Sequence, residues 1–223
     1  MTALGLGLFI VKVMIFCGGF RERKTRVLLP FFIGTLGERA QRARENLDLV
    51  AARGKVRENL DIIVEKHLHY KSINQKILKE IESVDYSESY KTNVKGKMTS
   101  FLFFPKEGQV IRDWVNALVY KDHPYLTSHG KIIHANSWIA KYDRGDYTIE
   151  HDHCPCLFSY IYYVNCPKGS SPLVFTSSGK RIKAEEGKVI IFPSIMKHDV
   201  PKNRCDDRIV LSGNVVLDTR RGL

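Results

Sequence analysis

Cysteine is scarce in this sequence and follows no regular spacing. The 223 residues include five cysteines, which are Cys17, Cys154, Cys156, Cys166 and Cys205. An odd number of unevenly placed cysteines is poor support for a disulfide framework. The sequence therefore predicts reduced thiols in an intracellular compartment, because disulfides persist mainly in oxidising compartments.

Most of the chain also lacks the strong positive charge that is typical of nucleic-acid-binding domains. The formal net charge is +11, but residues 1–57 hold 11 Lys and Arg against 4 acidic residues. The other 166 residues hold 24 against 20. Because the excess is concentrated in the first quarter of the chain, a nucleic-acid partner is not indicated.

The apolar N-terminal segment lacks the leading positive charge of a secretory signal. Residues 3–20 are apolar apart from Lys12, and the basic stretch "RERKTR" follows directly. If the segment inserts into a membrane, these charges would hold the rest of the chain on the cytoplasmic side. The alternatives are a buried strand or an extension outside the folded unit. We treat residues 1–57 as an N-terminal extension of a cytoplasmic protein, with a membrane-tethered form as the alternative.

Helical spacing of apolar residues begins after residue 58. The stretch "DIIVEKHLHYKSINQKILKEIES" carries them at Ile62, Ile63, Leu68, Ile73, Ile77, Leu78 and Ile81. A second helix is predicted in "QVIRDWVNALVYK", with an expected apolar face of Val110, Trp114, Ala117 and Leu118. Residues 58–130 are therefore expected to form helices that support the rest of the domain.

After Gly130 the pattern changes to short β-strands. The segments "KIIHANSWIAKY", "LFSYIYYVN", "PLVFTSS", "KVIIFPS" and "RIVLSGNVVLD" are rich in β-branched and aromatic residues. They are separated by Gly, Pro, Asn and Asp, which are typical of turns. Helices followed by many short strands indicate an α+β fold, in which residues 131–217 form a sandwich or jelly roll.

The motif "YTIEHDHCP" is a candidate metal site. His151 and His153 are two residues apart, so on a strand they project from the same face while Asp152 points away. His198 follows 45 residues after His153, and Arg208 opens the last predicted strand. Two ligands from one strand and a third from a distant strand can form a facial three-ligand site with open positions. An arginine in such a pocket can bind a carboxylate through two parallel hydrogen bonds.

From Asn136 to Leu217 the sequence resembles the double-stranded β-helix core of the Fe(II)- and 2-oxoglutarate-dependent oxygenases. The resemblance is carried by "NSWIAKYDRGDYTIEHDH", "FSYIYYVNCPKGSSPLVF" and "IKAEEGKVIIFPSIMKHDVPKNRCDDRIVLSGNVV". In order, these match the family's Tyr-x-x-Gly lead into the first ligands, its YYVN-type strand, its Gly-led strand, the distal histidine and the arginine. The resemblance covers roughly the last 90 residues, extends to the predicted helices of residues 58–130, and does not reach residues 1–57.

The resemblance implies a dioxygenase that uses Fe(II), O₂ and 2-oxoglutarate, with ascorbate as a candidate reductant. It would hydroxylate its substrate and release succinate and carbon dioxide. The iron would be bound by His151, His153 and His198. Arg208 would bind the distal carboxylate of 2-oxoglutarate, and Tyr142 would hydrogen-bond the same group. The substrate class stays open between a protein side chain, such as proline, and a small molecule. A folded domain of residues 58–223 is expected, with helices in 58–130 and the β core in 131–217.

The second ligand departs from the common pattern of the family. Most members have His-x-Asp, whereas this chain has His-x-His with Asp152 in between. A branch of the superfamily, in its prolyl hydroxylase-like group, resembles this His-x-His-x-Pro arrangement. We favour His153 as the ligand and keep Asp152 as the alternative. Further candidates to line the pocket are Asn136, Trp138 and Tyr162.

Three other interpretations stay open at this point. Zinc could bind through "HDHCPC", although its cysteines are too close together for the usual pairs of structural zinc sites. A cupin-like metal-binding module without 2-oxoglutarate turnover would keep the histidines but would not need Arg208. A membrane-tethered scaffold with a degenerate barrel would depend on the N-terminal segment and not on iron.

Overall fold

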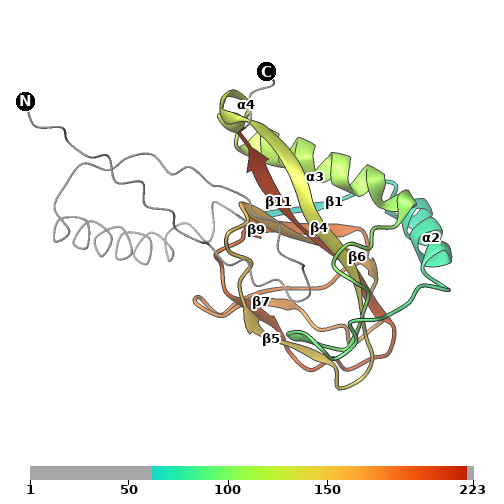
Figure 1. Cartoon of the computed structure of the whole chain (residues 1–223). Helices are drawn as coiled ribbons and strands as arrows, with labels where there is room; N and C mark the ends of the chain where they lie inside the picture. Colours follow the sequence, from blue (N-terminus) through green and yellow to red (C-terminus); the bar gives the residue numbers. More distant parts are fainter. Residues whose placement is uncertain (1–61, 220–223) are drawn as a thin grey trace, which may run out of the picture.

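The computed structural model describes residues 62–219 (Figure 1). The expected N-terminal extension and the start of the predicted helical region, residues 58–61, lie outside this range. The candidate membrane segment at residues 3–20 lies outside it too. No helix between residues 62 and 219 is long and apolar enough to cross a membrane.

The described chain contains a few helices followed by a series of antiparallel strands. The helices are α2 (Tyr70–Glu80), η1 (Lys106–Gly108), α3 (Gln109–Asp122) and α4 (Leu126–His129). The strands are β1 (Ile63–Lys66), β2 (Val94–Lys95), β3 (Lys97–Met98), β4 (Lys131–Tyr142), β5 (Tyr147–His151), β6 (Phe158–Asn165), β7 (Leu173–Phe175), β8 (Lys180–Ile182), β9 (Lys188–Pro193), β10 (His198–Val200) and β11 (Arg208–Asp218).

The strands form two sheets. The larger sheet has the order β1-β9-β6-β11-β4-β3 and the smaller one has the order β2-β5-β10-β7-β8. β11 lies in the middle of the larger sheet and pairs with β4 from Arg208 opposite Tyr142 to Asp218 opposite Lys131. The strands predicted after Gly130 are therefore confirmed, and β8 and β10 are added to them.

Two hydrophobic clusters lie on the two faces of the larger sheet. On one face, Ile77 of α2 and Val115 of α3 pack against strand residues such as Tyr162 and Leu211. On the other face, residues such as Trp138 pack against the smaller sheet. The order of the layers is therefore helices, larger sheet and smaller sheet (Figure 1). The space between the two sheets is the place where a site can be enclosed.

The region expected to be wholly helical contains three short strands. Ile63–Lys66 forms β1, the edge strand of the larger sheet, which pairs with β9 and sets Ile63 opposite Ile191. The helix begins only at Tyr70, and Leu68, which helical spacing had placed on the buried face, is 91% exposed. The expectation was wrong because a free sheet edge determines the conformation of this segment, and tertiary context overrides local spacing. β2 and β3 are likewise short additions to sheet edges.

The helix predicted over residues 109–121 is confirmed as α3, but its buried face is rotated. The buried residues are Ile111, Val115, Leu118 and Val119, while Val110 is exposed. The observed buried face is shifted by one residue from the expected one, and one residue corresponds to a rotation of about 100° around the helix axis. The rotation also brings the polar residues Arg112 and Asn116 to the side of β4.

Two side chains one turn apart on α3 hold this helix on β4. Arg112 Nη2 donates to Ser137 Oγ at 2.6 Å. Asn116 Oδ1 lies 3.1 Å from His134 Nε2, and an amide oxygen can only accept, so this nitrogen carries the proton. Burial and the positive charge of Arg112 lower the pKa of His134 to about 4. His134 is therefore neutral in the folded protein near pH 7.

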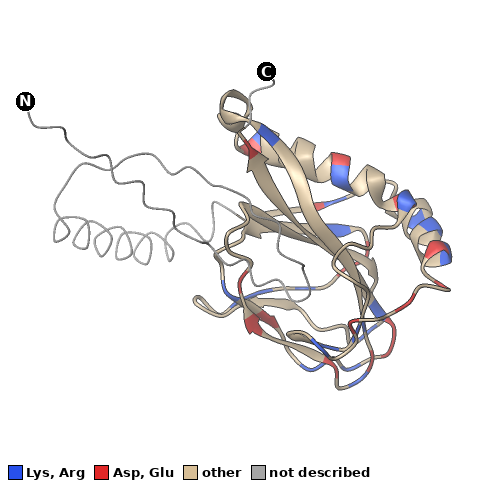
Figure 2. Cartoon of the chain, in the orientation of Figure 1, with Lys and Arg blue, Asp and Glu red and all other residues tan. Residues whose placement is uncertain are grey.

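Charged residues lie mainly on the helices and connecting loops, with both signs interspersed (Figure 2). The inner strands carry almost none. Arg208 is the exception, because it is the one Lys or Arg that is fully buried within residues 62–219, with 1% of its surface exposed.

The stability of the fold should decrease as the pH falls from about 6.5 to 4, in part through His134. In this range an unfolded histidine, with a pKa near 6.5, binds a proton that the buried ring does not bind. Replacement by a side chain that does not titrate, His134→Gln, should make this decrease shallower. Urea unfolding at pH 7.5, 6 and 5 gives the free energy of unfolding of parent and variant at each pH. If this free energy falls equally with pH in both proteins, the lowered pKa of His134 is contradicted.

Candidate metal centre

Two histidines face each other across neighbouring strands of the smaller sheet. His151 ends β5 and His198 begins β10, and the two are directly opposite in the antiparallel ladder. Their ring centroids are 4.3 Å apart. The pairing of β5 with β10 thus brings together two side chains that are 47 residues apart in the sequence.

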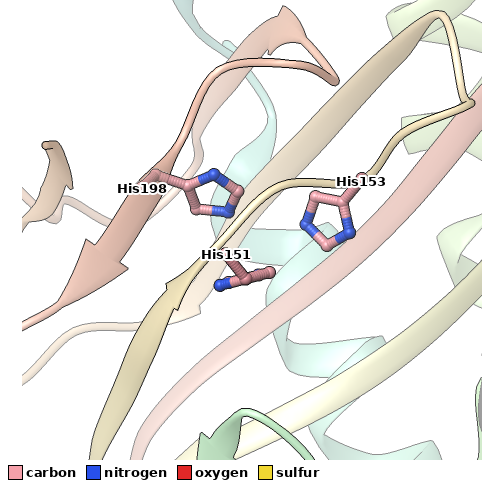
Figure 3. Close-up of side chains that lie close together, drawn as sticks. All are labelled: His151, His153 and His198. Carbon is pink, nitrogen blue, oxygen red and sulfur yellow. The ribbon is translucent and has the colours of Figure 1, made fainter. Parts of the chain in front are cut away.

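His153 joins them from the loop that follows β5 (Figure 3). Its ring centroid lies 4.7 Å from that of His151 and 5.1 Å from that of His198. Its backbone N–H donates to the carbonyl of Ser194 at 2.8 Å, which fastens the loop to the end of β9. β5 ends at His151, yet the side chains of His151 and His153 still converge, as the alternation of a strand predicts.

The group of ligand atoms contains only histidines. One nitrogen from each of the three rings can be chosen so that all lie within 4.8 Å of one another. Asp152 is exposed, and its Oδ1 accepts a hydrogen bond from the backbone N–H of Cys154 at 3.1 Å. Neither Asp152 nor any of the four cysteines between residues 62 and 219 belongs to the group. The arrangement favours nitrogen ligands over the sulfur site that the sequence left open.

Backbone carbonyls fix which nitrogen of two rings is free. His151 Nδ1 lies 2.8 Å from the carbonyl oxygen of Ile149, and His198 Nδ1 lies 2.9 Å from that of Met196. Because a carbonyl can only accept, both Nδ1 atoms carry the proton, and in a neutral ring Nε2 keeps its lone pair. This orientation of the ring is the usual support for a histidine that binds a metal.

The surroundings keep all three rings neutral. Burial lowers the pKa of His153 to about 2 and that of His198 to about 3, with further lowering by the neighbouring histidines. Burial also lowers the pKa of His151. Only a neutral imidazole can bind a metal ion. The cluster thus fits a cation that prefers nitrogen ligands.

A buried hydrogen-bond network supports the loop of His153. Ser159 Oγ of β6 donates to Asn214 Oδ1 of β11 at 2.7 Å and lies 2.8 Å from Ser194 Oγ. Ser194 holds His153 through its carbonyl, and all three members of the network are less than 5% exposed. Asn214 Nδ2 also donates to Asn136 Oδ1 at 2.8 Å. Asn136, which was expected to line the pocket, is therefore part of this network.

Arg208 lies at the start of β11 and has unused donors. Its Nε donates to the carbonyl of Ser171 at 3.2 Å. Nη1 and Nη2 are buried and have no hydrogen-bond partner within residues 62–219. A buried guanidinium left without a partner costs several kcal/mol, so natural proteins normally pair it. The two free nitrogens fit an anionic group from outside this part of the chain.

Two tyrosines flank this guanidinium. Its central carbon lies 4.6 Å from the ring centroid of Tyr142 and 5.4 Å from that of Tyr163. The Tyr142 hydroxyl is 2.8 Å from Thr148 Oγ1, and either oxygen can be the donor, so Tyr142 keeps its own proton available when Thr148 donates. The Tyr163 hydroxyl is buried without a hydrogen-bond partner in the described chain, and burial raises its pKa to about 12, so it keeps its proton. Tyr163 can therefore donate to the same anion as Arg208.

Sequence reasoning missed Tyr163 and chose its neighbour. Tyr162 points to the opposite face of the sheet, where its hydroxyl donates to Asn74 Oδ1 of α2 at 2.7 Å. The expectation that Tyr162 lines the pocket was therefore wrong. The alternation of Ser159, Ile161 and Tyr163 on one face of β6 was the available signal.

A narrow pocket is lined by the three histidines and by Tyr142, whose ring lies beside Arg208. Its walls include Trp138, Tyr142, Thr148 and Phe192. Trp138 was expected there, and its ring centroid lies 5.8 Å from that of His153. A larger hollow lies away from the histidines, between α2 and the start of α3. We place the chemistry in the narrow pocket, because the three histidines line it and Tyr142, whose ring lies against the guanidinium of Arg208, forms part of its wall.

The choice between His153 and Asp152 can be tested by metal binding alone. His153→Ala should weaken Fe(II) binding, measured anaerobically by calorimetry, by about 100-fold or more, because even residues that only support a ligand contribute about 10- to 100-fold. Asp152→Ala is the matched control and should change the Fe(II) affinity by less than about twofold. The reverse order of effects would make Asp152 the ligand.

Comparison with known proteins adds information about the fold. No protein-family profile and no curated protein sequence matches the chain. A viral collagen prolyl hydroxylase from Paramecium bursaria Chlorella virus 1, solved as its 2OG complex, matches with a TM-score of 0.54 and 16% identity, over 70% of this chain and 96% of the viral one. A Pseudomonas putida prolyl-4-hydroxylase matches with a TM-score of 0.53 and 14% identity, over 76% of this chain and 100% of the bacterial one. The chain therefore has the fold of these two prolyl hydroxylases.

Proposed function

We propose that this protein is an Fe(II)- and 2-oxoglutarate-dependent dioxygenase that hydroxylates its substrate and releases succinate and carbon dioxide. One observation carries the proposal. A buried guanidinium with two unpaired nitrogens, Arg208, lies beside the wall of the pocket that holds three neutral histidines. Such a pocket offers a place for a metal ion and, next to it, a place for a carboxylate.

The three histidines would hold the iron. Their neutral rings, two of them oriented by backbone carbonyls, supply nitrogen ligands that suit iron as well as other transition metals. Three protein ligands leave coordination positions open. When bound, the iron would supply the activation of O₂ and the redox chemistry, which no side chain of the pocket can supply.

Arg208 and Tyr163 would bind the distal carboxylate of 2-oxoglutarate. The guanidinium can donate two parallel hydrogen bonds, and the protonated Tyr163 hydroxyl can donate a third. Tyr142 would contribute the face of its ring and, with Thr148 donating to its oxygen, a hydrogen bond from its hydroxyl. The hydrogen bond from Tyr142 that the sequence predicted stays a prediction, and we add Tyr163 as a further candidate donor.

The walls of the pocket would keep water away from the reacting atoms. Trp138, Tyr142 and Phe192 are each at most 6% exposed and surround the histidines with apolar surface. A dry site strengthens the interaction between Arg208 and a carboxylate, because the local dielectric constant is low. It also limits side reactions of a reactive centre.

The two sheets would then be the halves of a double-stranded β-helix, with α2 and α3 as the supporting helices. Residues 58–223 remain our proposed catalytic domain, in a cytoplasmic protein, and ascorbate remains a candidate reductant. The matching viral and bacterial proteins are named as prolyl hydroxylases. Prolyl peptides are therefore the first substrates to test, followed by small molecules.

A cupin-like metal-binding module is the competing function. It would use the same three histidines, but it gives no reason to bury an arginine whose donors are unpaired. Burial of Arg208 reduces the stability of the metal-free protein unless an anion compensates. This cost favours a protein whose ligand is an anion.

The test is anaerobic titration of the full chain with Fe(II) and then 2-oxoglutarate, monitored by the weak visible absorption band of the chelate. We expect the band in the parent. Arg208→Met should bind 2-oxoglutarate about 30-fold more weakly or worse, because the loss of one partner of a buried charge pair costs about 2 kcal/mol or more. The same variant should raise the unfolding temperature of the metal-free protein, since it removes an unpaired buried charge.

Arg204→Met is the matched control, because Arg204 is exposed and lies four residues before Arg208. It should leave both the band and the unfolding temperature unchanged. If the parent binds Fe(II) but never gives the band, the oxygenase function is excluded and the cupin-like function is supported.

A further inference from the structure

A β-bulge lies between the two residues that would hold the carboxylate. In the ladder of β6 with β11, Tyr163 is opposite Val210 and Asn165 is opposite Ile209, so Val164 has no partner on β11. A bulge of this kind bends the strand and changes the direction of the neighbouring side chain. The bulge here directly follows Tyr163, whose ring lies beside Arg208.

The carbonyl groups of this bulge are bound by a side chain from α2. Asn74 Nδ2 donates to the carbonyl of Val164 at 2.6 Å and lies 3.4 Å from that of Tyr163. Asn74 Oδ1 accepts from the hydroxyl of Tyr162 at 2.7 Å. Because carbonyls only accept and this hydroxyl donates, the orientation of the amide is fixed by its partners. Asn74 is 4% exposed, in a helix whose other buried side chains, Ile73 and Ile77, are apolar.

Burial of an amide has a cost that an apolar residue on the same helix face would avoid. The cost is compensated by its hydrogen bonds to the bulge carbonyls and to the Tyr162 hydroxyl. The Gly187 N–H also donates to the carbonyl of Tyr163, at 2.9 Å, so the backbone is held from the residue before β9 as well as from α2. Asn74 thus holds this part of β6 from the helix side of the sheet, while the Tyr163 side chain lies on the opposite side.

We propose that Asn74 is a positioning residue for the anion site, which holds the β6 bulge so that Tyr163 and Arg208 point to the same carboxylate. The inference rests on the proposed function, because the carboxylate is that of 2-oxoglutarate. It assigns to the helical layer a role in co-substrate affinity that is separate from metal binding. The metal ligands lie on β5, β10 and the loop after β5, which Asn74 does not contact.

The test compares two affinities in the full chain, that for Fe(II) and that for 2-oxoglutarate with Fe(II) bound, both measured anaerobically. Asn74→Ala should weaken 2-oxoglutarate binding on the order of tenfold and leave Fe(II) binding within about twofold of the parent. Asn74→Asp should weaken 2-oxoglutarate binding at least as much. The aspartate side chain has the same size and still accepts from the Tyr162 hydroxyl. Its second oxygen, however, replaces the donor Nδ2 and faces the carbonyls of Tyr163 and Val164, which also only accept.

Two controls separate positioning from general loss of stability. Tyr162→Phe removes the partner of Oδ1 but leaves the bonds to the bulge, so 2-oxoglutarate affinity should stay near that of the parent. Ile77→Val shortens a fully buried side chain of the same helix and should lower the unfolding temperature without changing the 2-oxoglutarate affinity.

The inference is overturned if Asn74→Ala and Asn74→Asp bind 2-oxoglutarate like the parent. It is also overturned if they lose Fe(II) and 2-oxoglutarate affinity to the same extent, or if Ile77→Val reproduces their effect at equal stability. Failure of the proposed function gives a different result, because the parent itself would then bind Fe(II) without 2-oxoglutarate.

Discussion

The unpaired guanidinium of Arg208 is the constraint on which the rest of the structure depends. A buried positive charge is tolerated only where an anion can reach it, and no carboxylate between residues 62 and 219 forms an ion pair with it. Its position at the start of the central strand β11, opposite Tyr142, places it beside one end of the narrow pocket. The two sheets enclose this charge, and the helices cover the outer face of the larger one.

The metal centre depends on a different part of the fold. His151 and His198 meet because β5 and β10 pair, and His153 follows because Ser194 binds its backbone. The larger sheet therefore carries Arg208, and the smaller sheet carries two of the three clustered histidines. Chemistry that needs both must take place between the sheets, in the pocket where their side chains meet. Stability and function compete there, since the neutral buried histidines weaken the metal-free fold at low pH, and the unpaired arginine weakens it at any pH.

Much of this arrangement could be predicted from local patterns. Period-two alternation gave the convergence of His151 and His153, and the turn residues gave the strands after Gly130. The conformation of Ile63–Lys66 could not be predicted, because the free edge of β9 decides it. The role of Tyr163 was missed for a related reason. Alternation along β6 puts Tyr162 and Tyr163 on opposite faces, but the pairing of β6 with β11 decides which face lies beside Arg208, and pairing is a property of two distant segments and not of either sequence. Asn74 shows the same limit, since one buried amide in a helix gives no indication of the bulge that it binds.

The most direct test is a crystal structure of the protein grown without oxygen in the presence of Fe(II) and 2-oxoglutarate, with anomalous data collected at the iron edge. Our account predicts a single anomalous peak between His151, His153 and His198, and a carboxylate of 2-oxoglutarate within hydrogen-bond distance of Arg208 and Tyr163. A peak at Cys154 and Cys156, or 2-oxoglutarate bound away from Arg208, would contradict it.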